Sequence, residues 1–367
     1  MKKTKKFIAN VLNIALPIVL ALLFGAICLL IVGKNPLDVY GYLVRKTLLD
    51  GGGFMNSLGY ATPILMTGIA TALSYTANVY NMGIEGQMYM GAFFATFLGW
   101  TLQGLPSWLH ITICLAGGAL AGMAYAMIPA ILKAVYRINE VVTTIMLNSI
   151  AIIFTAYLTN GPFSDNVGFA ATFPIAKSAQ ISRIISRYRV TYAIFIAVAI
   201  IAIIWFLERK TRFGYEIKTL GRQQEFADAV GMEANKKIIL IFLIGGAIGG
   251  IAGATEMMGV NIRFTPSWST NPGLGWDGQA VCLLAHQNPI AILITGVLFG
   301  AFKYGGVTLQ SNMGVSLDII NIIKSSLILF LAAQYVYTHK GWFKELTDWI
   351  ENRKPAVKQN GEVQSNG

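Results

Sequence analysis

The sequence predicts an all-α polytopic membrane protein with about ten transmembrane helices. Composition is the first reason: of 367 residues, 55% are hydrophobic and 12% are charged, whereas about a quarter of the residues in soluble domains are charged. The second reason is that apolar runs recur along the chain, most of them close to the roughly 20 residues that a helix needs to cross a bilayer. So few polar residues could not cover a water-soluble protein. Residues 1–340 are therefore expected to form one transmembrane domain.

The net charge of +11 is better explained by membrane topology than by nucleic-acid binding. The basic residues flank the apolar runs instead of forming one stripe. The three cysteines form no CxxC pair, and the three histidines lack metal-ligand spacing. No GxxxxGK[ST] loop is present, so ATP binding by that route is not expected. We expect no catalytic residue, metal or cofactor in this chain.

The predicted spans begin with the apolar run 7–32, which follows the basic sequence MKKTKK and is too long for a signal-peptide core. We expect it to remain as the first helix, with the amino terminus in the cytoplasm. Further spans are expected at 54–77, 78–100, 109–132, from 138 onward, and at 192–207, 238–258 and 315–336. Glycine pairs four residues apart, which let membrane helices approach closely, occur at Gly118 and Gly122 and at Gly246 and Gly250.

Two shorter apolar segments precede the last span and are separated by Asn288 and Pro289. The segment within 275–287 either crosses the membrane or re-enters it. A crossing places the tail, residues 341–367, in the cytoplasm, which its basic residues favour. The end of this tail has the composition of a disordered segment. Lys324, near the start of the last span, is expected to extend its ammonium group to the membrane interface.

The longest strongly charged interruption is the loop 209–237, whose basic residues indicate a cytoplasmic location. A helical pattern appears near 223–230, with Phe226, Ala229 and Val230 on one side. Gly231 is placed to end this helix in a left-handed conformation. We therefore expect a short amphipathic helix that offers an apolar face.

Polar residues within the spans allow two interpretations. Glu85 lies near the start of the third span, where a carboxylate either faces a pathway or partner or belongs to a polar cytoplasmic turn. Glu140, Thr144 and Asn148 recur every four residues and so share one helix face. That face either lines a polar cavity or donates and accepts hydrogen bonds with neighbouring helices.

The chain contains, in this order, the blocks NMGIEGQMYMGA, NEVVTTIMLNSIA, TRFGYEIKTLG, GGAIGGIAGA and GLGWDGQAVCLLAHQNPIAILITGVLFG. Together they resemble successive blocks of the ribose, branched-chain amino acid and nucleoside permease family of ABC importers. The first two blocks and GPFSDNVGFAATFPIAKSAQIS look most like the nucleoside (simple sugar) permeases. VCLLAHQNP departs from the family's usual VALLG and leaves the shape of that turn open.

A shorter match lies in the charged loop, where EFADAVG resembles the EAA loop of ABC-importer permeases. Glu225, Ala227 and Gly231 match that motif at its spacing, and Phe226 departs from its first alanine. The resemblance implies that these four residues belong to the helix that docks on the ATPase subunit.

The family resemblance implies an ABC-importer permease fold and a transport subunit rather than an enzyme, in a bacterial cell membrane with both termini cytoplasmic. Its expected partners are cytoplasmic ABC ATPases that bind ATP and Mg, a second permease that is identical or different, an extracellular substrate-binding lipoprotein and membrane lipid. No nucleic-acid partner is expected.

A nucleoside presents a flat base and ribose hydroxyls, which suit aromatic faces, amides and carboxylates. The residues predicted to line the substrate pathway on that ground are Glu85, Phe94, Asn148, Trp276 and Gln279. A ribose-like sugar or another small solute is an alternative cargo. An ion-coupled secondary transporter is the other alternative, with Glu85 and the Asn288-Pro289 break forming the ion site.

Overall fold

The computed structural model describes residues 19–165, 168–229, 231–270 and 273–339, and these residues are helical apart from turns, loops and one isolated bridge. An apolar helix, Val19–Ile31, comes first. The other elements are α2 (Pro36–Val44), η1 (Arg45–Leu49), α3 (Gly51–Thr76), α4 (Ile84–Thr101), α5 (Ser107–Ala134), α6 (Glu140–Asn160), η2 (Lys177–Ala179), α7 (Ala193–Lys210), α8 (Arg212–Arg222), α9 (Gln224–Ala229), α10 (Ala234–Glu256), η3 (Met257–Asn261), α11 (Pro266–Thr270), α12 (Leu274–Leu284), α13 (Pro289–Met313) and α14 (Leu317–His339). The predicted tail 341–367 lies outside the described residues.

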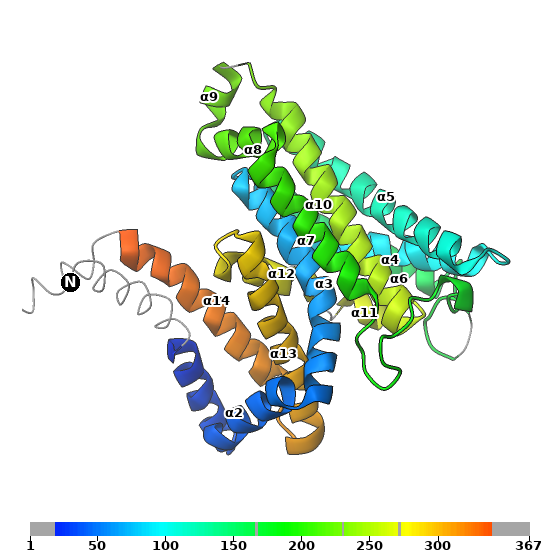
Figure 1. Cartoon of the computed structure of the whole chain (residues 1–367), viewed down its shortest axis with the longest axis vertical. Coiled ribbons are helices and arrows are strands. Elements are labelled where there is room, and N and C mark those ends of the chain that lie inside the picture. Colours follow the sequence, from blue (N-terminus) through cyan, green and yellow to red (C-terminus); the bar gives the residue numbers. More distant parts are fainter. Residues whose placement is uncertain (1–18, 166–167, 230, 271–272, 340–367) are drawn as a thin grey trace, which may run out of the picture.

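Four helices in the described part of the chain are long and apolar enough to cross a membrane: Ser107–Ala134, Glu140–Asn160, Ala234–Asn261 and Pro289–Met313. The helices α3, α4 and α7 pack beside them (Figure 1). The all-α membrane fold is therefore confirmed, while the number of crossings stays a prediction.

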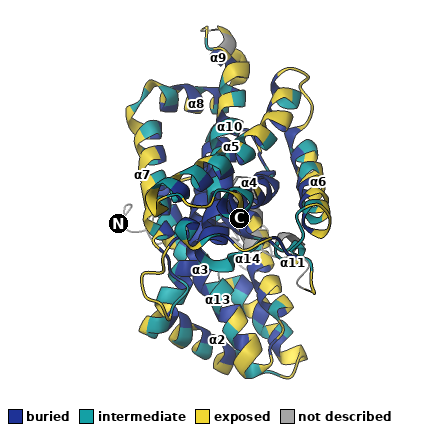
Figure 2. Ribbon diagram, turned by 90° about the vertical axis from the view of Figure 1, so that its right-hand side faces the viewer, coloured by how far each residue is buried: buried dark blue, intermediate teal, exposed yellow. Residues whose placement is uncertain are grey.

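The core forms where α10 packs against α3, α4 and α5 (Figure 2). A Cβ atom on Gly250 would overlap the backbone of Gly118, and one on Gly122 would overlap the carbonyl oxygen of Gly246. The backbones of α5 and α10 can approach this closely only because these positions lack side chains. The close approach predicted from the glycine spacing is confirmed.

The charged loop projects from one end of the molecule, opposite the end that carries α2 (Figure 1). It holds two short helices rather than the single one expected from the sequence. The predicted helix corresponds to α9, and the additional helix, α8, has charged and apolar residues on opposite sides. The amphipathic pattern of residues 212–222 could have revealed α8, because apolar residues at helical spacing indicate a packed helix face.

The segment before Asn288 forms α12, a helix of 11 residues and so about 16 Å long, too short to cross a bilayer alone. Its first residue, Leu274, accepts a hydrogen bond through its carbonyl oxygen from the Thr67 hydroxyl at 2.9 Å. Thr67 lies well inside the 26-residue helix α3, nine residues before its end. The amino-terminal end of α12 is therefore buried deep within the bundle. Whether 275–287 crosses or re-enters stays open.

Candidate functional site

The buried start of α12 is held by Glu85, which lies in the first turn of α4. Its carboxylate accepts hydrogen bonds from the backbone N–H groups of Gly275 and Trp276 and from the Tyr89 hydroxyl. The first N–H groups of a helix have no partner within the helix and carry partial positive charge, so a carboxylate is a suitable cap. A Cβ on Gly275 would overlap Glu85, which explains the glycine. Glu85 thus fixes where the broken helix begins.

The polar face of α6 binds the backbone on either side of Glu85, at Met82 and Gly86. Asn148 accepts a hydrogen bond from the Gly86 N–H and donates one to the Met82 carbonyl, both at 2.8 Å. The Thr144 hydroxyl accepts a hydrogen bond from the Met82 N–H at 3.2 Å, and Glu140 is paired with Lys133 at 2.7 Å. Of the two interpretations of this face, hydrogen bonding to neighbouring segments describes what these side chains do here.

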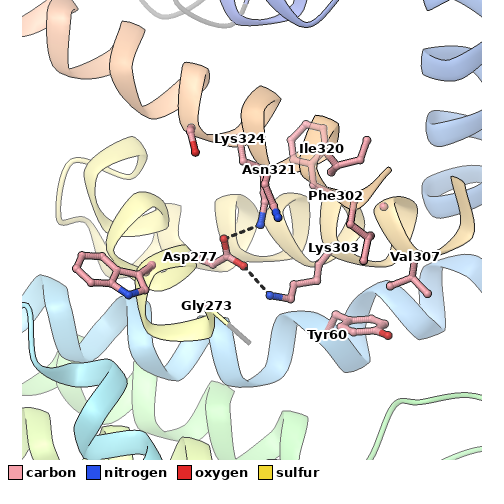
Figure 3. A pocket seen from close by; sticks show the side chains of 13 residues that line it. Tyr60, Gly273, Asp277, Phe302, Lys303, Val307, Ile320, Asn321 and Lys324 are labelled. Atoms are coloured by element: carbon pink, nitrogen blue, oxygen red, sulfur yellow. Dashed lines mark hydrogen bonds and ion pairs between the residues drawn. The ribbon is translucent and has the colours of Figure 1, made fainter. Parts of the chain in front are cut away.

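A cavity of about 440 Å³ lies between α3, α12, α13 and α14. Its lining includes Tyr60, Trp276, Asp277, Lys303, Asn321 and Lys324 (Figure 3). The Asp277 carboxylate is shared by two lysines: Oδ1 accepts from Lys324 Nζ at 2.9 Å, and Oδ2 is 3.3 Å from Lys303 Nζ. Asp277 and Lys324 are each only 10% exposed at the side chain. Three charged groups from three helices therefore meet at one cavity.

The charged cluster lies beside the middle of α13, a helix long and apolar enough to cross a membrane. Lys303 follows the start of α13 by 14 residues and precedes its end by 10, which places it about 21 Å and 15 Å from the two ends. Ionisable groups at such depth are costly in lipid and usually face a bundle interior or a water-filled path. The cluster therefore makes this cavity the candidate site for a polar solute.

An arginine from the long connection between α6 and α7 packs on Tyr60, a residue of the cavity wall. Arg189 pairs with Glu256, and its guanidinium lies over the Tyr60 ring at 4.1 Å from the centroid. Tyr60 in turn stacks on Tyr304, with centroids 6.2 Å apart. These contacts join the connection to α3, α10 and α13, and they fix the orientation of Tyr60 at the cavity wall.

Four of the five predicted pathway residues, Glu85, Asn148, Trp276 and Gln279, meet around residues 82–86, and Phe94 lies apart from them. Trp276 lines the cavity and is 44% exposed. Gln279 is buried and lies 3.4 Å from the Met82 carbonyl, near the Asn148 contacts, and Glu85 caps α12. Phe94 packs against Phe93, with centroids 5.8 Å apart, and does not line this cavity. The pathway role of these residues stays a prediction.

The sequence interpretation missed the charged residues that line the cavity. Lys324 was expected to extend to the membrane interface, but it is buried and bonded to Asp277, so that expectation is wrong. The reason is that a carboxylate from another helix offers the ammonium group a nearer partner than the interface. A signal was available in Asp277 and Lys303, which stand in otherwise apolar segments. Among the described residues, no three His, Cys, Asp or Glu side chains gather to hold a metal ion.

The predicted coupling residues lie on α9 and just after it, at the end of the molecule away from α2. Glu225 and Phe226 are exposed, as a docking face requires, and Gly231 has a φ of +78°, the left-handed conformation expected of it. Ala227 is only 1% exposed and so packs inward instead of contributing to that face. Val230 lies outside the described residues. The coupling role of this segment stays a prediction.

The second helix of this loop, α8, is firmly attached to the bundle. A Cβ on Gly221 would overlap the carbonyl oxygen of Thr76, the last residue of α3. Glu216 forms ion pairs with Lys237 of α10 at 2.5 Å and with Arg212 at 3.0 Å. The hydrogen bond from Lys237 and the two positive charges hold the pKa of Glu216 below its ordinary value. A displacement of α8 would therefore be passed directly to α3 and α10.

A family model described as the branched-chain amino acid transport system / permease component matches residues 53–332. The chain belongs to this family. Family membership and the apolar helices make it a multi-pass membrane protein and a transport subunit. They confirm the ABC-importer permease fold and favour ATP-driven import over the ion-coupled alternative.

Several curated permeases are similar to this family member over most of their length. The guanosine ABC transporter permease protein NupP of Bacillus subtilis is 29% identical, over 90% of this chain and 95% of its own. The glucose ABC transporter permease protein TsgB13 of Haloferax volcanii is 29% identical, over 86% of this chain and 85% of its own length. The nucleoside ABC transporter permease protein NupB of Lactococcus lactis is 28% identical, over 91% of this chain and 93% of its own length. No solved structure matches the chain significantly.

Proposed function

We propose that this chain is the membrane-spanning subunit of an ABC importer for nucleosides. The observation that carries the proposal is the cavity beside the middle of α13, at which Asp277, Lys303 and Lys324 meet beside Trp276 and Tyr60. Its volume of about 440 Å³ lies within the range of small-molecule sites. Relatives named for guanosine and nucleosides support this choice of solute.

The cavity combines the two kinds of group that a nucleoside needs. The Trp276 ring can pack against a flat base, whose faces are apolar, and Tyr60 can offer its edge. The carboxylate and ammonium groups can accept from and donate to ribose hydroxyls. The base and the sugar would thus be recognised by different parts of one wall.

ATP hydrolysis is proposed to occur in separate cytoplasmic ATPase subunits that dock on α8 and α9. Their closure would displace α8, which touches the end of α3 at Thr76 and is paired with α10 through Glu216. The turn after Thr76 leads to Glu85, the cap of α12. Movement could therefore reach the cavity through a continuous set of contacts and open it alternately to each side. A second permease and an extracellular binding protein would complete the importer.

A sugar is the second candidate solute, because a relative named for glucose is as similar as the one named for guanosine. A sugar would use the charged groups of the cavity without needing the aromatic rings to enclose a base. Competition between the two solutes distinguishes these possibilities.

The test is uptake by the reconstituted importer, with the ATPase, the second permease and the binding protein in proteoliposomes. Labelled guanosine should accumulate with ATP and should not accumulate with a non-hydrolysable analogue. Excess unlabelled adenosine should compete, and excess glucose should not. Guanosine uptake that is independent of ATP, or abolished by glucose alone, would contradict the proposal.

A further inference from the structure

We propose that Asp277, held between Lys303 and Lys324, binds the pair of neighbouring hydroxyl groups on the sugar ring of the solute. The inference deepens the proposed function and rests on it only in requiring a solute that carries a sugar. Figure 3 shows Asp277 between the two lysines, with Tyr60 on the side of Lys303.

The carboxylate is held in a fixed orientation. Each of its oxygens is engaged by a lysine from a different helix, Oδ1 by Lys324 of α14 and Oδ2 by Lys303 of α13. Rotation of the carboxylate would break both contacts. A carboxylate offers about four lone-pair positions, so each oxygen can accept a further hydrogen bond while it keeps its lysine. Two hydroxyl groups on adjacent ring carbons can supply one donor to each oxygen.

The lysines complement the same pair of hydroxyl groups. An ammonium group carries three N–H donors, so Lys324 can hold Asp277 and also donate to a hydroxyl oxygen. The ring hydroxyl on the Lys324 side would then donate to the carboxylate and accept from that ammonium group. Hydrogen bonds in which one partner is ionised are about twice as strong as neutral ones.

The arrangement favours a neutral polyhydroxylated solute over an anion. Two ammonium groups by themselves would attract a phosphate or carboxylate. Asp277 lies between the two ammonium groups, however, so an anion that reached both lysines would also approach a carboxylate oxygen. Like charges at that separation repel. A hydroxyl pair meets no such repulsion, because it can donate to the carboxylate.

The test compares guanosine with 2′,3′-dideoxyguanosine, which keeps the base and lacks the hydroxyl pair. Binding is measured by saturation-transfer NMR titration of the complete permease–ATPase complex, without the binding protein, so that only this site discriminates. The wild-type complex should bind guanosine at least about tenfold more tightly than 2′,3′-dideoxyguanosine. A hydrogen bond to a charged group contributes enough free energy for a factor of that size. Asp277→Asn should weaken guanosine binding by about that factor and leave dideoxyguanosine unchanged.

Asp277→Asn leaves two buried lysines without their carboxylate and could therefore misfold. A double variant separates loss of binding from loss of folding. Asp277→Asn with Lys324→Gln removes one positive charge as well, so its abundance and elution profile should return to wild type while the discrimination stays lost. The matched control is Asp165→Asn, which breaks the 2.6 Å ion pair between Asp165 and Arg263. Neither residue lines the cavity. This control should leave both affinities unchanged.

Equal weakening of both solutes by Asp277→Asn would show that Asp277 only shapes the cavity and would overturn the inference. Absence of binding of both guanosine and glucose by the wild-type complex would overturn it too. Binding of glucose but not guanosine, with the same loss in Asp277→Asn, would refute nucleosides as the solute and support the hydroxyl site.

Discussion

Glu85 is the residue on which the geometry of the broken helix depends. Two backbone N–H groups at the start of α12 donate to its carboxylate, and the carboxylate and the Gly275 N–H are buried. Loss of a buried hydrogen-bond partner leaves the remaining group desolvated and unpaired, at a cost of about 1 to 3 kcal/mol. A carboxylate near membrane depth is therefore explained here by the needs of the backbone.

Glu85→Ala should lower the stability of the protein by about 1 to 3 kcal/mol and reduce uptake, because α12 loses its cap. Glu85→Gln should lie between Glu85→Ala and wild type, since an amide keeps one oxygen acceptor. Tyr89→Phe is the control, because it removes one donor and leaves both contacts to α12. Thermal unfolding in detergent, followed by size-exclusion chromatography, measures these differences. Wild-type stability of Glu85→Ala would contradict the capping role.

At the scale of elements, α8 touches the bundle through a glycine. Gly221→Ala would place a methyl group against the Thr76 carbonyl oxygen and push α8 away from α3. We expect normal membrane insertion and normal docking of the binding protein, but a loss of ATP-driven uptake and of solute-stimulated ATP hydrolysis. The control is Gly41→Ala in α2, where a Cβ meets no atom within 4 Å. If Gly221→Ala transports like wild type, motion is not passed through this contact.

The ion pair between α8 and α10 should give the loop a defined pH response. The pKa of Glu216 is lowered from 4.5, chiefly by the hydrogen bond from Lys237. Its stabilising contribution is therefore present above the ordinary glutamate pKa and is lost as the pH falls through the lower, folded-state value.

The wild-type protein should accordingly be more stable than Glu216→Gln by a constant margin between about pH 7 and pH 5.5, and this margin should shrink below about pH 4.5. Thermal unfolding of both proteins across this range measures it. The exposed pair of Lys236 and Glu233 serves as a control, because Glu233→Gln breaks a solvated ion pair and should change stability little. A margin that grows as the pH falls would have the wrong sign for this ion pair.

At the scale of the whole molecule, the basic tail predicts that both termini are cytoplasmic and that the number of crossings is even. A reporter that is active only in the cytoplasm should be active when it is fused after Gly367. A second fusion within 209–237 should report the same side, because that loop is also basic. Opposite sides for the two fusions would require an odd number of crossings between them.

The sequence by itself determined the class of this protein and its family. Composition and apolar runs decide the membrane fold, because a chain with so few charged residues is stable only in lipid. The glycine pairs of α5 and α10 and the left-handed Gly231 were also predictable, since each is a local requirement of backbone geometry. The helix α8 could have been predicted in the same way, from its own amphipathic pattern.

Only the tertiary structure decided what the polar residues do. Asp277 is 26 residues from Lys303 and 47 from Lys324, yet all three meet at one cavity, and Glu85 is 190 residues from the N–H group of Gly275 that it caps. Hydropathy and periodicity describe one segment at a time. The partner of a buried charge is set by which helices pack together, so the physical reason that Lys324 faces inward lies on another helix.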